Sequence, residues 1–158
     1  MPQTMHARNA VSAKMAECYI TIDNQRYNFM SAINVEVTFE KNKTEVPILG
    51  RMNKGNKAVG STIRGSAEFH LNTSIWRELA YKFQETGEDI YFDMQITNED
   101  VTASDIGRQT IILYDCNWDS MTLAAFDADS DDVLTESIDF TAERFEMPEK
   151  YTKMDGMI

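Results

Sequence analysis

The sequence predicts a mainly β domain in which two antiparallel sheets pack as a sandwich or barrel, with one flanking α-helix and a long projecting hairpin loop. Three observations support this fold class. Several runs alternate apolar and polar residues, as half-buried strands do, because successive side chains of a strand point to opposite faces. One segment, residues 74–86, carries the apolar stripe of an amphipathic helix. A basic, polar stretch separates the two longest alternating runs.

The longest alternating runs cover residues 33–40 and 62–71, and they predict a pair of antiparallel strands. The stretch between them, residues 41–57, is too long and too polar for a tight hairpin turn. We therefore expect a structureless loop that projects from the domain and contacts a partner.

The helix has clear start and stop signals. Asn72-Thr73-Ser74 offers side chains that can cap a helix N-terminus, and Gly87 suits its C-terminal end. The apolar stripe, which includes Trp76 and Leu79, predicts that the helix packs on a sheet.

Shorter alternating runs predict the remaining strands. In chain order they cover residues 18–22, 90–97, 110–118, 121–126 and 134–143. Asp23-Asn24-Gln25 predicts a turn after the first of them, and Asp127–Asp132 an acidic turn before the last. We expect residues 1–16 to form a flexible N-terminal arm, residues 17–150 a single β domain, and residues 151–158 a C-terminal tail.

The charge of the chain is high and uneven. A net charge of -11 argues against a general nucleic-acid binder, which normally carries a basic surface. Residues 41–64 nevertheless hold one acid, Glu45, and six basic side chains, which are Lys41, Lys43, Arg51, Lys54, Lys57 and Arg64. A basic projection on an acidic body favours head-to-tail self-association. The alternative is a solvated loop with scattered lysines.

The cysteines and the apolar runs help to predict the cellular compartment of the protein. Cys18 and Cys116 lie far apart in strand-like runs without metal-type spacing, so we expect buried free thiols in a reducing cytosol. No apolar run approaches the length of a membrane span, and the N-terminus lacks the apolar core of a signal peptide. We expect a cytosolic protein unless it is exported without a signal.

The catalytic and ligand-binding sequence motifs that this chain resembles are all incomplete. Residues 50–57 resemble a phosphate loop but lack its Gly-Lys-Ser/Thr ending. Asp127–Asp132 opens like a calcium loop, but the required glycine and the bidentate glutamate are missing, so we predict no tight, specific calcium site. His6 and His70 have no Cys, Asp or Glu at ligand or triad spacing. We therefore expect no catalytic residue, no metal and no cofactor.

Several ordered motifs resemble a known family. The segments Phe39–Arg51, Leu113–Ser120 and Phe140–Lys150, together with Gly60 and Gly65, are similar in order and spacing to the tail tube proteins of contractile phage-like particles. The type concerned is found in defective prophages of Gram-positive bacteria. The likeness spans roughly residues 17–150.

This resemblance implies a two-sheet fold whose subunits form hexameric rings that stack into a hollow tube inside a contractile sheath. The tube would give DNA or ions a channel through the target envelope. The implied partners are further copies of the chain, the tail sheath protein, and baseplate and tail-terminator proteins, with DNA only in transit and no stable membrane association. The subunits would assemble in the bacterial host cytoplasm and then belong to a virion tail or an extracellular phage-tail-like particle.

The family pattern also suggests roles for individual residues. The hairpin 39–64, with its six basic side chains, would contact a neighbouring subunit, in the adjacent ring, aided by the N-terminal arm. Closing a ring turns one polar sheet face towards water, so we expect a polar, mostly acidic channel wall. The candidates are Glu36, Thr38, Glu40, Ser66, Glu68, Asp139, Thr141 and Glu143. The alternative is that these acids keep the outer surface soluble.

Other interpretations stay open at this point. The same tube could belong to a phage, to a DNA-free R-type bacteriocin or, with a poorer match of the motifs, to a type VI secretion system. In a different class of function, the strands alone would serve equally well in a monomeric β-sandwich that binds a ligand.

Overall fold

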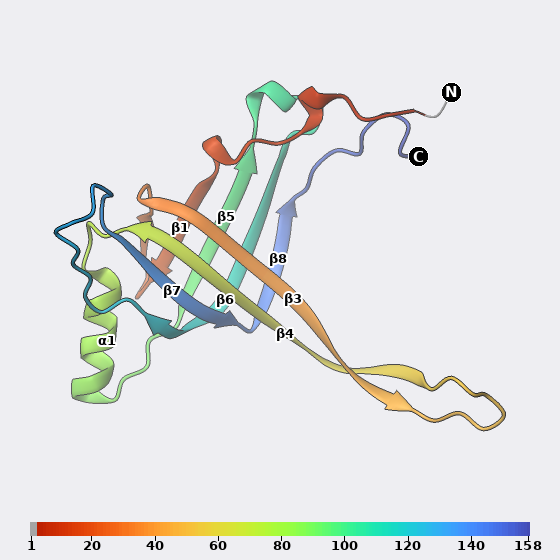
Figure 1. Cartoon of the computed structure of the whole chain (residues 1–158), viewed down its shortest axis with the longest axis horizontal. Coiled ribbons are helices and arrows are strands. Elements are labelled where there is room, and N and C mark those ends of the chain that lie inside the picture. The colour runs from red at the N-terminus through yellow and green to blue at the C-terminus, as the bar shows by residue number, and fades with distance from the viewer. Residues whose placement is uncertain (1–2) are drawn as a thin grey trace.

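The computed structural model describes residues 3–158 and is strand-rich (Figure 1). The strands are β1 (Glu17–Ile22), β2 (Gln25–Asn28), β3 (Ala32–Val46), β4 (Gly55–His70), β5 (Phe92–Glu99), β6 (Arg108–Met121), β7 (Thr135–Ala142) and β8 (Arg144–Glu149). The helical elements of these residues are α1 (Ile75–Thr86) and the short 3₁₀ turns η1 (Ala7–Asn9), η2 (Ala13–Met15) and η3 (Val101–Ala103). The prediction of a mainly β fold with one flanking α-helix is confirmed.

Strand β6 joins two packed layers. All strands belong to one antiparallel sheet in the order β2-β1-β5-β6-β7-β4-β3, and β8 also pairs with β6. The first part of β6 pairs with β5 and β8, whereas residues 117–121 pair with β7. At the change of partner, Asp115 has a positive φ of 53° beside a register shift, the geometry of a bulge that bends a strand. The sheet therefore folds into a five-stranded layer (β2-β1-β5-β6-β8) and a four-stranded layer (β6-β7-β4-β3).

The core lies between the two layers, and α1 closes one end of it. Trp76 of α1 is buried against Phe29, Phe69 and Phe92, with ring centroids 5.6, 5.9 and 5.2 Å away. Gly65 of β4 faces the same interior, and a Cβ at this position would lie only 2.5 Å from the ring of Phe140. Large aromatic side chains and one obligatory glycine thus set the spacing of the layers.

The first hairpin turn and the two ends of α1 lie where the sequence predicts them. Asp23 and Asn24 have positive φ values of 50° and 65°, as a two-residue hairpin turn of type I′ requires. The hydroxyl of Thr73 accepts a hydrogen bond from the Ile75 N–H (3.4 Å). Gly87 adopts the left-handed conformation, and its N–H donates to the Phe83 carbonyl (2.9 Å).

The prediction of a structureless loop at residues 41–57 is wrong. Strands β3 and β4 continue through most of it, and Val46 pairs with Gly55, so that the connecting loop is residues 47–54. The alternation that marks a strand is lost here because this two-stranded extension has no buried face.

Two further details differ from the sequence prediction. The prediction of a separate strand at residues 121–126 is wrong, because β6 ends at Met121 and the residues that follow are irregular. The short strands β2 and β8 were not predicted. Both lack a continuous apolar face, and β8 contains Pro148, which is tolerated in a strand that pairs on one side.

Candidate assembly surfaces

The face of the four-stranded layer that points away from the core is polar. Its side chains are Asn34, Glu36, Thr38 and Glu40 on β3, Thr62, Arg64, Ser66 and Glu68 on β4, and Ser137, Asp139 and Thr141 on β7. We call this surface the polar face. Of the eight residues expected at a channel wall, seven lie on it, whereas Glu143 lies in the bend between β7 and β8. Strand register thus brings together carboxylates that lie more than 100 residues apart in the sequence.

Arg64 lies on the polar face, away from the tip of the hairpin. Its cross-strand neighbours are Thr38 on β3 and Thr141 on β7. The Thr38 hydroxyl donates to the backbone carbonyl of Arg64 (3.3 Å). The guanidinium of Arg64 therefore belongs to a predominantly acidic surface, which distinguishes it from the other basic residues expected at a subunit contact.

Beyond the end of β7, strands β3 and β4 continue alone as a projecting arm (Figure 1). We define the arm as residues 40–62, because β7 ends at Ala142 opposite Ile63. It carries the remaining basic candidates: Lys41 and Lys43 on β3, Arg51 and Lys54 in the loop, and Lys57 on β4. At its tip Leu49 and Met52 are fully exposed. Apolar side chains held this far from the core suit a contact with another chain.

The four-stranded layer has two free edges. Within the described residues, β3 pairs only with β4, and residues 117–121 of β6 pair only with β7. Their outer backbone N–H and C=O groups are available to a strand of another molecule. Neither edge was predicted from the sequence, because an edge is a property of the whole topology.

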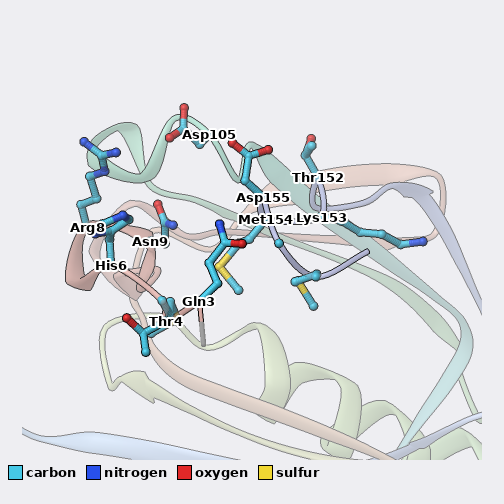
Figure 2. A pocket seen from close by; sticks show the side chains of 13 residues that line it. Gln3, Thr4, His6, Arg8, Asn9, Asp105, Thr152, Lys153, Met154 and Asp155 are labelled. Atoms are coloured by element: carbon cyan, nitrogen blue, oxygen red, sulfur yellow. The ribbon is translucent and has the colours of Figure 1, made fainter. Parts of the chain in front are cut away.

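The described segments 3–6 and 152–157, near the two ends of the chain, lie side by side (Figures 1 and 2). They enclose a hollow of about 510 Å³ lined by residues 3–6, Arg8, Asn9, Asp105 and residues 152–157. Figure 2 shows Gln3 beside Met154 and Asp155, with His6 and Arg8 to its left and Lys153 to its right. The lining mixes charged, amide, hydroxyl, imidazole and thioether groups.

One carboxylate fastens the N-terminal segment to the domain. Asp100 accepts hydrogen bonds from the Thr102 hydroxyl (2.6 Å), the Ser12 N–H (2.8 Å) and the Thr102 N–H (3.0 Å). These bonds, first the one from the Thr102 hydroxyl, hold the pKa of Asp100 below its ordinary value, because they stabilise the ionised form. Sequence reasoning missed this contact, since Ser12 and Asp100 are far apart in the chain.

The lowered pKa gives a testable pH dependence. A carboxylate with a lowered folded-state pKa contributes stability at neutral pH, and the contribution is lost as the pH falls below about 4 and through the folded-state pKa. We expect acidification, or Asp100→Ala at neutral pH, to release the segment around Ser12 while the sheet stays folded. Hydrogen exchange of the Ser12 amide measures this release. Asp105→Ala, in the same loop, is the control, and equal exchange in the two variants would contradict the assignment.

The described residues hold neither a metal-type cluster nor a membrane-spanning helix. Between residues 3 and 158, no group of three or more His, Cys, Asp or Glu side chains is placed to hold a metal ion. In the same range, no helix is long and apolar enough to cross a membrane. Cys18 and Cys116 are buried, and burial raises the pKa of each thiol to about 12. The acidic turn Asp127–Asp132 lies in an exposed loop, and the absence of a calcium site there stays a prediction.

The fold is shared with chains of contractile injection systems. A chain in the baseplate of the anti-feeding prophage (AFP) is 14% identical with a TM-score of 0.65, and the match covers 87% of this chain and 94% of that one. A chain in the sheath–tube complex of the extracellular contractile injection system PVC is also 14% identical, with a TM-score of 0.61 and coverage of 91% and 98%. The molecule thus has the fold class of contractile tail tubes.

The chain belongs to the phage tail tube protein family, whose model matches residues 3–149. It is 35% identical over 146 residues to the phage-like element PBSX protein XkdM of Bacillus subtilis (strain 168), a match that covers 92% of this chain and 95% of that protein. The family resemblance seen in the sequence is confirmed, and the chain is a structural tail tube protein.

Proposed function

We propose that this protein forms the inner tube of a contractile phage or phage-like particle by closing into hexameric rings that stack on one another. The observation that carries the proposal is the four-stranded layer, which combines one polar face with two free edges. Pairing of β3 in one subunit with residues 117–121 of the next removes both edges at once. A ring closed in this way is a continuous barrel whose polar face can line a channel.

The proposed channel wall is mostly acidic. Glu36, Glu40, Glu68 and Asp139 lie on the polar face, with Arg64 among them. Fixed negative charge repels DNA phosphates, so a transiting duplex would not bind, whereas a basic wall would bind phosphates and release their counterions. The same wall would favour cations if the particle kills its target by leaking ions.

The comparisons support proposals for the other partners. The similar chains come from structures of a baseplate, a sheath–tube complex and a tube-terminating cap of contractile systems. We propose partners of the same classes here: a sheath around the tube, a baseplate at one end and a terminator at the other. Assembly would take place in the bacterial host cytoplasm, before the tube becomes part of a virion tail or of an extracellular particle.

Electron microscopy of concentrated protein, alone and in native particles, tests this function. We expect rings or tubes with a central hole, and a high-resolution map should place Glu36, Ser66 and Asp139 on the bore. A basic or apolar bore would contradict the assignment of the wall. A protein that stays monomeric at every concentration and in native particles would contradict the function itself. DNA in the purified particles would indicate a phage, and its absence an R-type bacteriocin.

A further inference from the structure

The arm and α1 lie at opposite ends of the four-stranded layer. The arm precedes the body of β4, whereas His70 at the other end of β4 leads directly into the turn before α1. The Leu71 N–H donates to the Leu134 carbonyl (3.0 Å), which brings segment 122–134 to the α1 end. Figure 1 shows this separation along the longest axis of the molecule. A subunit therefore cannot place its own arm tip against its own α1 end.

An apolar groove runs between α1 and segment 122–126. Ala80 and Tyr81 of α1 and Leu123 give a hollow of about 510 Å³ a mostly apolar surface, and the polar side chains of Ser74, Arg77, Glu78 and Gln84 complete its lining. A second hollow of about 350 Å³, half polar, continues it past Ala124 and Ala125. Tyr81 is 65% exposed and Leu123 69% exposed, although both are large apolar side chains. We call this surface the α1 groove. Contiguous exposed apolar surface of this kind is typical of an interaction site.

The charges at the two ends are complementary. Segment 122–134 holds Asp127, Asp129, Asp131 and Asp132 and no basic residue, and its residues 123–125 line the α1 groove. Residues 41–57 of the arm hold five basic residues and Glu45 as the one acid. An apolar tip flanked by basic side chains thus matches a mostly apolar groove whose neighbouring segment is acidic.

We propose that the α1 groove binds the arm tip of a second copy of this chain, with Leu49 and Met52 against Tyr81 and Leu123. In this arrangement Arg51, Lys54 and Lys57 face the aspartates of segment 122–134. The two halves of the contact lie on one chain at opposite ends, so repetition is head-to-tail and generates an open-ended filament. The inference rests on the stacking of rings proposed above and assigns the surface that receives the arm.

A cross-link tests the pairing directly. In the Met52→Cys/Leu123→Cys variant, mild oxidation of assembled tubes should remove two hydrogens from facing thiols and link subunits into ladders. The native Cys18 and Cys116 are buried and should not react. The control is Met52→Cys/Met30→Cys, because Met30 is exposed beside a different hollow, between β2 and β3. Ladders from the control pair but not from the 52/123 pair would overturn the proposal.

A charge swap gives an independent measurement. Lys54→Glu/Lys57→Glu should raise the protein concentration needed for tubes by about three- to tenfold, because exposed ion pairs are individually weak. Asp129→Lys/Asp131→Lys should do the same, and the combined variant should regain the wild-type value. Failure of the combined variant to recover would contradict the pairing.

The outcomes separate this inference from the proposed function. If the wild type forms tubes but tubes of the Met52→Cys/Leu123→Cys variant do not cross-link, the α1 groove is excluded and the tube function stays intact. Wild-type protein that forms neither rings nor tubes would exclude both.

Discussion

Replacing residues 42–60 with Asn-Gly is expected to abolish tubes while the domain stays folded. Lys41 and Ser61 are cross-strand partners, so a two-residue turn can join them without changing the register of the body. The deleted residues lie beyond the end of β7 and are almost all exposed, so the free energy of unfolding should change by no more than about 0.5 kcal/mol. Thermal unfolding measures the stability, and electron microscopy counts the tubes.

A second variant separates the shape of the arm from the chemistry of its tip. Leu49→Ser/Met52→Ser keeps the length, the basic residues and the strand pairing of the arm but removes its fully exposed apolar side chains. We expect shorter and fewer tubes than for the wild type, because each subunit loses one apolar contact. Tubes of normal length from the variant that replaces residues 42–60 with Asn-Gly would show that the arm is not needed for assembly.

The parts of the fold that depend on local alternation could be predicted from the sequence. The polar face is the clearest case, because Glu36 and Ser66 each lie in a long period-two run whose parity assigns them to one side of a strand. The polar, acidic character of this face can therefore be predicted without knowing which strands pair. The helix and its ends followed in the same way from the capping residues and Gly87.

The parts that depend on pairing could not be predicted. Its closeness in sequence to Lys57 assigns Arg64 to the basic loop, but the register places it between Thr38 and Thr141. The bend of β6 at Asp115 is equally invisible, since a positive φ at an aspartate leaves no periodic signal. Edges, grooves and the contact between Ser12 and Asp100 all arise from chain segments distant in sequence.

A buried ion pair was missed for the same reason. Arg77 lies outside the apolar stripe of α1, yet it bonds to Glu136 of β7 at 2.5 Å, and the Glu136 side chain is only 3% exposed. The guanidinium also donates to the Thr73 and Thr122 carbonyls. Sequence periodicity predicts that the Arg77 side chain is exposed to solvent, because it describes a single helix. The Arg77–Glu136 ion pair forms only where the helix contacts the sheet.

Trp76→Ala is expected to destabilise the domain strongly, because it removes the side chain that joins α1 to both layers. Its indole is 1% exposed and packs against three phenylalanine rings. Truncation of such a side chain costs about 3–5 kcal/mol, because it loses apolar burial and leaves a cavity. For a domain of this size each kcal/mol lowers Tm by roughly 2–4 °C, so calorimetry should show a fall of roughly 6–20 °C.

Trp76→Phe is the matched control for this prediction. The indole Nε1 is buried without a hydrogen-bond partner among the described residues, so phenylalanine loses volume but no hydrogen bond. Its Tm should therefore lie much closer to that of the wild type. Because α1 carries Tyr81, loosening the helix in Trp76→Ala should also weaken ring stacking at temperatures well below its Tm. Equal Tm values for the two variants would contradict the prediction that the aromatic cluster anchors the helix.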